Sequence, residues 1–274
     1  MKNIKTLAVL NTLFFLVHLV PSQLTQFGVF NSQTIGDVSA QYPALFTPAG
    51  ITFSIWGVIY LGLSIFCIYH LIKAFKASPE HEANIDLQRL GNLFMVNNLA
   101  TGLWTIAWVN EWLVISVLLI LTQLVTLLLI HLRLNIFNAA RSAASRWFTQ
   151  VPLSLYFGWI IIATVANISS ALVGLGWDGF GLSEGLWTTI MIVAATLIVV
   201  FVVFARSNPY VGLVGVWALY GIILKHRDLN AEASSQIITT AWIGLAVVAL
   251  AAILIFFRNA SSSRQSVAPI SSKA

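Results

Sequence analysis

Charged residues are scarce in this chain. Only 8% of its 274 residues are Asp, Glu, Lys or Arg, with 14 Lys+Arg against 9 Asp+Glu. A soluble domain carries about 25% charged residues. The composition therefore excludes an ordinary soluble enzyme and a disordered or nucleic-acid-binding protein, and the net charge of +5 needs no nucleic acid to explain it.

Cysteine and catalytic motifs are also scarce. Cys67 is the single cysteine, which excludes an internal disulfide and a multi-cysteine metal site, and we expect it to be a small buried hydrophobic residue. The sequence shows no nucleotide-binding glycine loop, no metal-ligand spacing and no nucleophile motif. We therefore expect no catalytic residue, no metal site and no required cofactor.

Acidic residues are missing from the middle of every long apolar run. Each one lies in a predicted loop or at a predicted helix end: Asp37, Glu80, Glu82, Asp86, Glu111, Asp178, Glu184, Asp228 and Glu232. A carboxylate near the membrane midplane is the usual device for coupling transport to a proton or sodium ion. Its absence argues against an ion-driven transporter.

Hydrophobic residues make up 58% of the chain. A membrane span needs about 20 apolar residues, and the apolar runs predict eight helices near residues 4–24, 51–75, 90–109, 112–132, 148–172, 185–205, 209–224 and 236–257. The fold class is therefore an all-α polytopic transmembrane bundle. The Ser-rich tail from Asn259 is typical of a disordered segment.

Two connections affect the topology. The stretch from Thr25 to Gly50 contains no Lys or Arg, is too polar to span, and is long enough to fold over one mouth of the bundle. The first apolar run follows Lys2 and Lys5 as in a signal peptide, but no small-x-small cleavage site follows it, so we expect it to be retained.

Basic residues indicate the orientation. With the N-terminus in the cytoplasm, only Lys225 and Arg227 fall outside, and the other basic residues lie inside: Lys2, Lys5, Lys73, Lys76, Arg89, Arg133, Arg141, Arg146, Arg206, Arg258, Arg264 and Lys273. This asymmetry follows the positive-inside rule and predicts that both termini are cytoplasmic. The cluster Lys225 to Asp228 breaks the rule locally, and a re-entrant seventh segment is the alternative.

Two histidines of the predicted spans bear on a possible haem or proton-relay function. His18 lies inside the first span and His131 near the end of the fourth. His18 could be an axial haem ligand or a proton relay, but a helical histidine bonded to a neighbouring carbonyl is the commoner arrangement, and we expect that one.

Tryptophan is abundant, with ten residues. Trp112, Trp147, Trp177 and Trp187 lie close to predicted helix ends, where an aromatic belt explains them. Others lie deeper, where a flat ring can line a cavity and the indole N–H needs a partner. These deeper tryptophans are Trp56, Trp104 and Trp159.

Helical spacing groups the deeper residues into faces. At about 100° per residue, one stripe of the third span carries Asn97, Thr101, Trp104 and Trp108. One stripe of the fifth carries Pro152, Tyr156, Trp159, Ala163 and Asn167, and the second span places Trp56 one turn before Tyr60. These faces either converge on one pocket or pack the bundle and satisfy each other's hydrogen bonds.

These residues resemble a known family. The segment FTPAGITFSIWGVIY, residues 46–60, resembles the proline-containing loop and second helix of the tryptophan-rich sensory protein family, also called the translocator protein or peripheral benzodiazepine receptor family. Leu103-Trp104 is similar to its third helix, and Val151-Pro152 with Trp159, Ala163 and Asn167 to its fifth. The resemblance covers residues 1–172 as a five-helix bundle, and residues 173–258 add three transmembrane helices before a cytoplasmic tail at 259–274.

The resemblance implies a function. It suggests a receptor or sensor in a bacterial inner (plasma) membrane that binds planar hydrophobic ligands such as porphyrin or haem, with transport of the ligand as an extension. The ligand-lining residues carried over by position are Trp56, Tyr60, Thr101, Trp104, Trp159 and Ala163. Pro152 and Asn167 are assigned to packing. Thr101 stands where the family usually has Asn, which leaves ligand identity open.

Alternative functions remain at this stage. A binding protein is favoured over an enzyme, but photochemical degradation of porphyrin through tryptophan needs no acid or base, and an uncoupled carrier of small amphipathic solutes needs no buried carboxylate. The expected partners are a hydrophobic small molecule and membrane lipid. Gly212 and Gly215 allow close packing of the seventh helix inside the protomer or in a homodimer.

Overall fold

The computed structural model describes residues 3–137, 141–229 and 234–265, and every regular element in these ranges is helical. Eight of the described helices are long: α1 (Ile4–Leu24), α3 (Ile55–Lys76), α5 (Leu93–Val109), α6 (Leu113–Leu134), α8 (Val151–Gly174), α9 (Glu184–Arg206), α10 (Pro209–Leu229) and α11 (Ser234–Gln265). Each corresponds to one expected span. The prediction of a polytopic helical bundle is confirmed.

Short helices lie in the connections. They are η1 (Thr25–Phe27), α2 (Ile35–Gln41), η2 (Gly50–Ser54), α4 (Glu82–Leu90), α7 (Ala143–Ser145), the π-helix η3 (Arg146–Gln150) and η4 (Gly179–Gly181). The sequence analysis gave no helix for the connection that holds α4. Its first turn carries Glu82 and its last turn Arg89, which is the favourable arrangement for a helix dipole.

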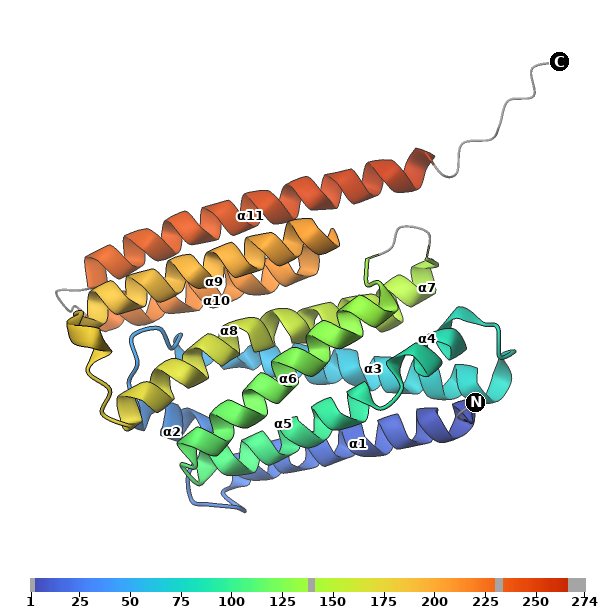
Figure 1. The fold of residues 1–274 in the computed structure, drawn as a ribbon, viewed down its shortest axis with the longest axis horizontal. Coiled ribbons are helices and arrows are strands. Elements are labelled where there is room, and N and C mark those ends of the chain that lie inside the picture. Colours follow the sequence, from blue (N-terminus) through green and yellow to red (C-terminus); the bar gives the residue numbers. More distant parts are fainter. Residues whose placement is uncertain (1–2, 138–140, 230–233, 266–274) are drawn as a thin grey trace.

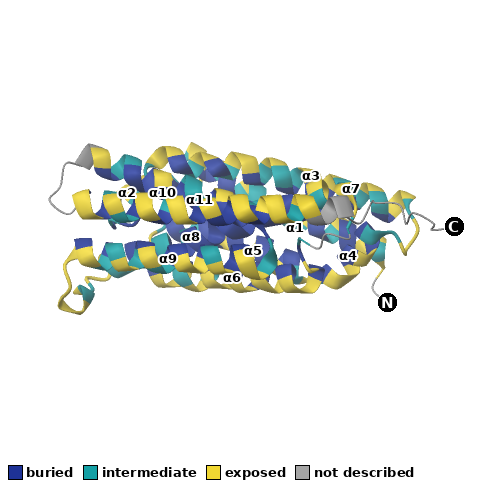
Figure 2. Cartoon of the chain, turned by 90° about the horizontal axis from the view of Figure 1, so that it is seen from above, coloured by how far each residue is buried: buried dark blue, intermediate teal, exposed yellow. Residues whose placement is uncertain are grey.

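Six described helices are long and apolar enough to cross a membrane: Ile4–Phe27, Gly50–Lys76, Leu113–Leu134, Ala143–Gly174, Glu184–Arg206 and Ser234–Ser261. Helix α5 is a shorter apolar helix, and α10 ends on a turn with His226 and Arg227. Large apolar side chains such as Leu61, Leu197 and Phe201 point outward. Figure 2 shows exposed residues along the outer faces and buried residues between the helices, as expected for a surface in contact with lipid.

The long helices form two groups. Helices α1, α3, α5, α6 and α8 pack together, and α9, α10 and α11 lie along the α8 side of that bundle (Figure 1). Close packing of α10 needs glycine. A Cβ added to Gly212 would lie 2.8 Å from the Cβ of Ala252 on α11, and one added to Gly215 would lie 2.9 Å from Val199 on α9. The two glycines therefore pack within the protomer.

Residues 25–54, here called the covering segment, lie over one end of the bundle, as expected from their length and polarity (Figure 1). The side chain of Thr34 caps α2 and bonds Asp37 in a capping box. The amide of Asn31 donates to the carbonyl of Val109 at 2.8 Å, and the indole of Trp108 donates to the carbonyl of Ile35 at 3.2 Å.

Helix α10 binds the other side of the covering segment. The expected charged loop at Lys225 is instead helical, because α10 continues to Leu229. Lys225 Nζ donates to the carbonyl of Ala44 at 2.9 Å, and His226 Nε2 lies 2.8 Å from the carbonyl oxygen of Leu45. The positive-inside rule predicts few basic residues at this end of the bundle. The hydrogen bond from Lys225 to the covering segment gives a structural reason for a basic residue there.

The opposite end of the bundle holds the N-terminus, α4 and α7 (Figure 1). Arg141 forms an ion pair with Asp86 there, and Ser142 donates to Glu82. Helix α11 continues to Gln265, beyond the end expected near residue 257. Lys2, Lys273 and residues 266–274 of the expected tail lie outside the described residues.

Candidate functional site

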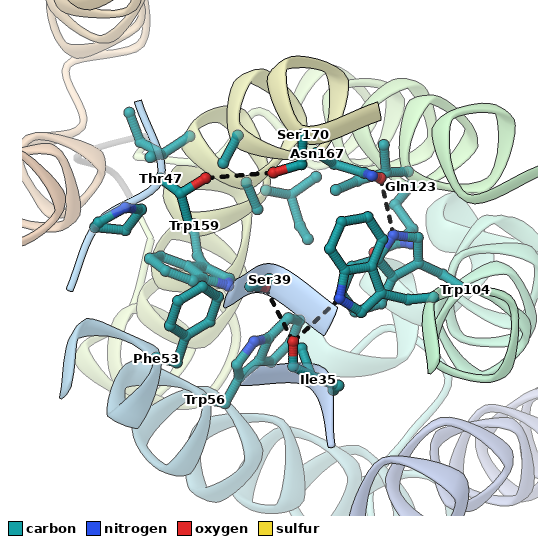
Figure 3. Close-up of a pocket in the computed structure, with 17 residues that line it drawn as sticks. Ile35, Ser39, Thr47, Phe53, Trp56, Trp104, Gln123, Trp159, Asn167 and Ser170 are labelled. Atoms are coloured by element: carbon teal, nitrogen blue, oxygen red, sulfur yellow. Dashed lines mark hydrogen bonds between the residues drawn. The ribbon is translucent and has the colours of Figure 1, made fainter. Parts of the chain in front are cut away.

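A narrow cavity lies beneath the covering segment, between α3, α5, α6 and α8 (Figure 3). Its free volume is about 30 Å³, which leaves room for a few water molecules at most. The lining residues are Ile35, Ser39, Thr47, Pro48, Phe53, Trp56, Trp104, Trp108, Ile120, Gln123, Trp159, Ile160, Ile162, Ala163, Ala166, Asn167 and Ser170.

Aromatic rings form most of the wall. Trp104 and Trp108 are one turn apart on α5 and stack with ring centroids 5.9 Å apart and an interplanar angle of 12°. Across the cavity, the ring of Trp159 meets the edges of Phe53 at 5.7 Å and of Trp56 at 6.3 Å. One stacked pair and three rings at right-angle contacts therefore line a common space (Figure 3).

Polar side chains fix some of these rings. The indole N–H of Trp104 donates to Asn167 Oδ1 at 3.0 Å, and Asn167 Nδ2 donates to Ser116 Oγ at 3.0 Å. Thr47 Oγ1 of the covering segment lies 3.3 Å from Ser170 Oγ on α8. The aromatic wall and its cover are thus joined to α6 and α8 by side-chain hydrogen bonds.

Other polar atoms of the wall have no protein partner. Trp159 is only 1% exposed, yet its indole N–H makes no hydrogen bond in the described protein. Both polar atoms of the buried Gln123 amide are likewise without a partner. Figure 3 shows the nitrogen-bearing edge of Trp159 directed into the cavity. A buried N–H without an acceptor is costly, and these groups leave free hydrogen-bonding capacity on the cavity wall.

Four of the six residues carried over from the family line this cavity: Trp56, Trp104, Trp159 and Ala163. The other two do not. Tyr60 stacks on the far side of Trp56 at 5.4 Å and lines a neighbouring cavity. Thr101 Oγ1 lies 2.7 Å from the phenolic oxygen of Tyr156, a contact that packs α5 against α8.

The sequence analysis assigned too small a role to two residues. Asn167, assigned to packing, also lines the cavity and accepts the hydrogen bond from Trp104. Trp108 shares the predicted stripe with Trp104 but was not placed at the site. Its position one turn from Trp104 was the available signal. The contributions of Ile35, Thr47 and Gln123 depend on contacts between distant segments, which no local pattern shows.

Neither His18 nor His131 lines the cavity. His131 Nδ1 lies 2.8 Å from the carbonyl oxygen of Leu127. His18 Nδ1 lies 3.0 Å from the amide oxygen of Asn98 on α5, a side-chain partner instead of a backbone carbonyl. The rings of Tyr60 and Tyr156 pack around His18. No His, Cys or Met is among the lining residues, so these would hold a planar ring but supply no axial ligand to a metal.

One comparison with known proteins identifies a family. A family model described as TSPO-like protein matches residues 8–254. The match extends past residue 172, where the resemblance in sequence had ended, and includes most of the three added helices. Comparisons with curated proteins and with solved structures gave no match. The chain is an integral membrane protein and belongs to the TSPO-like protein family.

Proposed function

We propose that this protein is a membrane receptor or sensor that binds planar hydrophobic molecules of the tetrapyrrole class in the cavity beneath the covering segment. The observation that carries the proposal is the unpaired, buried N–H of Trp159 within a wall of flat aromatic rings. Stacking surfaces hold a flat ring, and a few polar groups fix its orientation. The small side chain of Ala163 leaves space for a ligand on the α8 side of the cavity.

The cavity must open for such a ligand. Ligand pockets usually measure about 300–1,000 Å³, against about 30 Å³ here. Binding therefore includes the movement of wall residues or of the covering segment. A ligand that opens the cavity binds with an apparent affinity that is reduced by the free energy needed to open it.

Porphyrin titration of the purified protein in detergent tests the proposal. We expect saturable quenching of tryptophan fluorescence. Trp159→Phe keeps a ring but removes the N–H, and we expect it to weaken binding about fivefold to tenfold, as for the loss of one hydrogen bond. Trp147→Phe is the matched control, because Trp147 is 56% exposed and does not line the cavity. Quenching that does not saturate would overturn the proposal.

We also propose that both termini face the cytoplasm of a bacterial inner membrane. The described basic residues Lys5, Lys73, Arg89, Arg133 and Arg206 lie in α1, α4 or the last turns of α3, α6 and α9, which share the end of the bundle with the N-terminus (Figure 1). Labelling of introduced cysteines in intact cells tests this. Position 180, exposed at the other end, should react with a membrane-impermeant reagent, and position 80 should not.

A further inference from the structure

A second cavity, here called the α9 cavity, lies at the end of the bundle that the covering segment occupies (Figure 1). It is bounded by the last turns of α8, the connection to α9, the start of α9 and residues 44–46, and its free volume is about 270 Å³. Small-molecule sites usually measure about 300–1,000 Å³, so the α9 cavity is close to the size that a small ligand needs. No described residue lines both this cavity and the narrow one.

Two tryptophans form a corner of the α9 cavity. Trp177 and Trp187 both line it, and their ring centroids are 4.8 Å apart with an interplanar angle of 70°. The ring of Phe180 also meets that of Trp177, at 5.0 Å and 87°. An aromatic belt accounts for tryptophans near helix ends but not for their meeting at one cavity. Aromatic rings set at an angle around a space are the usual device for binding alkylammonium ions.

The charged side chains of this wall are acidic. Asp178 and Glu184 line the cavity, and no Lys, Arg or His is among its described lining residues. Asp178 Oδ1 accepts a hydrogen bond from the N–H of Phe180 at 3.0 Å, and neither carboxylate forms an ion pair with a described basic residue. Lys225 bonds the carbonyl of Ala44, a wall residue, but its own side chain is not part of the wall. The wall therefore carries two negative charges that a cationic ligand would neutralise.

Two buried hydroxyls also line the α9 cavity. Ser169 is 7% exposed and Thr188 is 4% exposed, and neither hydroxyl bonds another described residue. The neighbouring Thr189, by contrast, donates to the carbonyl of Gly185 at 2.9 Å. Because the two carboxylates are exposed and the two hydroxyls buried, the charges lie at the mouth of the cavity and the hydroxyls at its floor. The floor can thus bond a polar group of a ligand.

We propose that the α9 cavity binds a small organic cation of the alkylammonium class. The ammonium group lies against Trp177 and Trp187 and is paired by charge with Asp178 and Glu184, while an oxygen of the ligand bonds the hydroxyls of the floor. Soluble amino alcohols and the headgroups of choline and ethanolamine lipids share this chemistry. The inference does not depend on tetrapyrrole binding, because the two cavities have separate walls.

The first experiment compares choline with 3,3-dimethylbutan-1-ol, which has the same shape but carries carbon in place of the charged nitrogen. Saturation-transfer NMR observes the methyl protons of each compound with purified protein in a nonionic detergent, after correction for protein-free micelles. We expect saturable binding of choline, and binding of the neutral alcohol that is at least about tenfold weaker. Equal binding of the two compounds, or no saturable choline signal, would overturn the inference.

The second experiment removes the charges and keeps the shape. In the double variant Asp178→Asn, Glu184→Gln, position 178 keeps its acceptor for Phe180, and we expect at least about a tenfold loss of choline affinity with unchanged porphyrin quenching. Glu111→Gln is the matched control, because Glu111 lies at the same end of the bundle but does not line this cavity. An equal loss for Glu111→Gln, or unchanged choline affinity of the folded double variant, would contradict the proposal.

A third variant keeps the test independent of how well the double variant folds. Trp187→Leu preserves an apolar wall but removes one ring, and we expect about a fivefold loss of choline affinity. Trp242→Leu on α11 is its control, because Trp242 does not line the α9 cavity. Equal choline affinities of these two variants would remove the aromatic corner from the site.

Lipid nanodiscs identify the source of the cation. Choline is titrated into protein in discs of phosphatidylglycerol alone and in discs that also contain phosphatidylcholine and phosphatidylethanolamine. Weaker choline binding in the mixed discs assigns the α9 cavity to a lipid headgroup, and equal binding in both assigns it to a soluble ammonium compound. No choline binding in either disc would overturn the inference.

Discussion

The first five long helices and the last three differ in what they bury. Most buried polar side chains of the described chain belong to the first group or its connections, whereas residues 173–265 bury only Thr188, Thr196, Asn208, His226 and Ser234. Asn97, Asn98 and Asn167 each bond a neighbouring helix or its own backbone in the first group. Side-chain hydrogen bonds specify one arrangement of neighbouring helices, so polar contacts fix the helix arrangement in the first group more than in the last three helices.

The last three helices pack mainly through close van der Waals contact at small residues. Gly212, Gly215 and Gly244 let α10 and α11 approach their neighbours closely. Its hydrogen bonds to the rest of the protein come partly from Arg206 and Asn208, which bond His131, Asn135 and Ser154. The others join α10 to the covering segment: Trp217 donates to the carbonyl of Thr52 at 2.9 Å, and the N–H of Ala49 donates to the carbonyl of Gly221 at 3.0 Å. These bonds hold the covering segment against α10.

The largest effect is expected where α10 meets the covering segment. A Cβ at Gly221 would lie 2.0 Å from Thr52 Oγ1, so Gly221→Leu should destabilise the protein by about 3 kcal/mol and weaken porphyrin binding. Gly57→Leu introduces the same side chain into open space and should keep its stability or gain up to about 1 kcal/mol. Equal thermal stability of the two variants would contradict the close contact of Gly221 with Thr52 and the open space at Gly57.

The next effect separates the two groups directly. Asn167→Leu leaves the Trp104 indole without its acceptor and removes the donor to Ser116 Oγ, which still donates to the carbonyl of Leu113, and we expect a loss of about 1–2 kcal/mol. Thr196 on α9 is buried with an unpaired hydroxyl, so Thr196→Val should be neutral or stabilising. Unfolding in detergent measures both. A larger loss for Thr196→Val would contradict the assignment of polar specificity to the first group.

A smaller effect tests the hydrogen bond between α10 and the covering segment. Trp217→Phe keeps the ring but removes the N–H that bonds Thr52, and we expect about 0.5–1 kcal/mol of destabilisation. Porphyrin dissociation should also become faster, because the cover is held less firmly. Trp242→Phe on α11 is the control, since Trp242 is 41% exposed. Identical dissociation rates for the two variants would show that the contact between α10 and the covering segment does not affect ligand binding.

The smallest effect depends on pH. The Tyr42 hydroxyl donates to Glu111 Oε2 at 2.6 Å, and this hydrogen bond raises the pKa of Tyr42 above its usual value of 10. A raised pKa means that the folded state favours the protonated phenol, so the stabilisation is present below pH 10 and is lost as the pH rises further.

Tyr42→Phe should therefore lower the melting temperature slightly at pH 7, by no more than a few tenths of a kcal/mol in stability because the pair is exposed. The difference from the unsubstituted protein should shrink as the pH rises above 10. Glu111→Gln keeps an acceptor and serves as the control. A difference that persists unchanged at pH 11 would show that the phenol proton is not responsible.

The sequence predicted the helices well because each long apolar run leaves the backbone of a membrane segment little choice but a helix. Helical spacing put Trp56, Trp104, Trp159 and Ala163 on helix faces but left open whether those faces converge, and only the resemblance to the family placed the four residues at one site. Helical spacing does not fix how each helix is rotated in the bundle. For that reason Thr101 and Tyr60, which share faces with site residues, do not line this cavity.

Contacts between distant segments could not be predicted. The bonds from Lys225 to Ala44 and from Trp217 to Thr52 join residues more than 160 positions apart. The charge pattern at Lys225 indicated an exposed loop, because a basic residue at a span end usually lies in water. A carbonyl of the covering segment satisfies that residue instead. The role of α10 follows from this tertiary contact and not from a local motif.

The central claim is that the ligand binds among the tryptophans of the first group and not among those of the last three helices. Incorporation of 5-fluorotryptophan gives one fluorine resonance for each tryptophan, and Trp→Phe variants assign them. On addition of porphyrin we predict shifted resonances for Trp56, Trp104, Trp108 and Trp159, with Trp147 and Trp242 unchanged. Shifts confined to Trp177 and Trp187, which line a separate cavity near α9, would contradict the account.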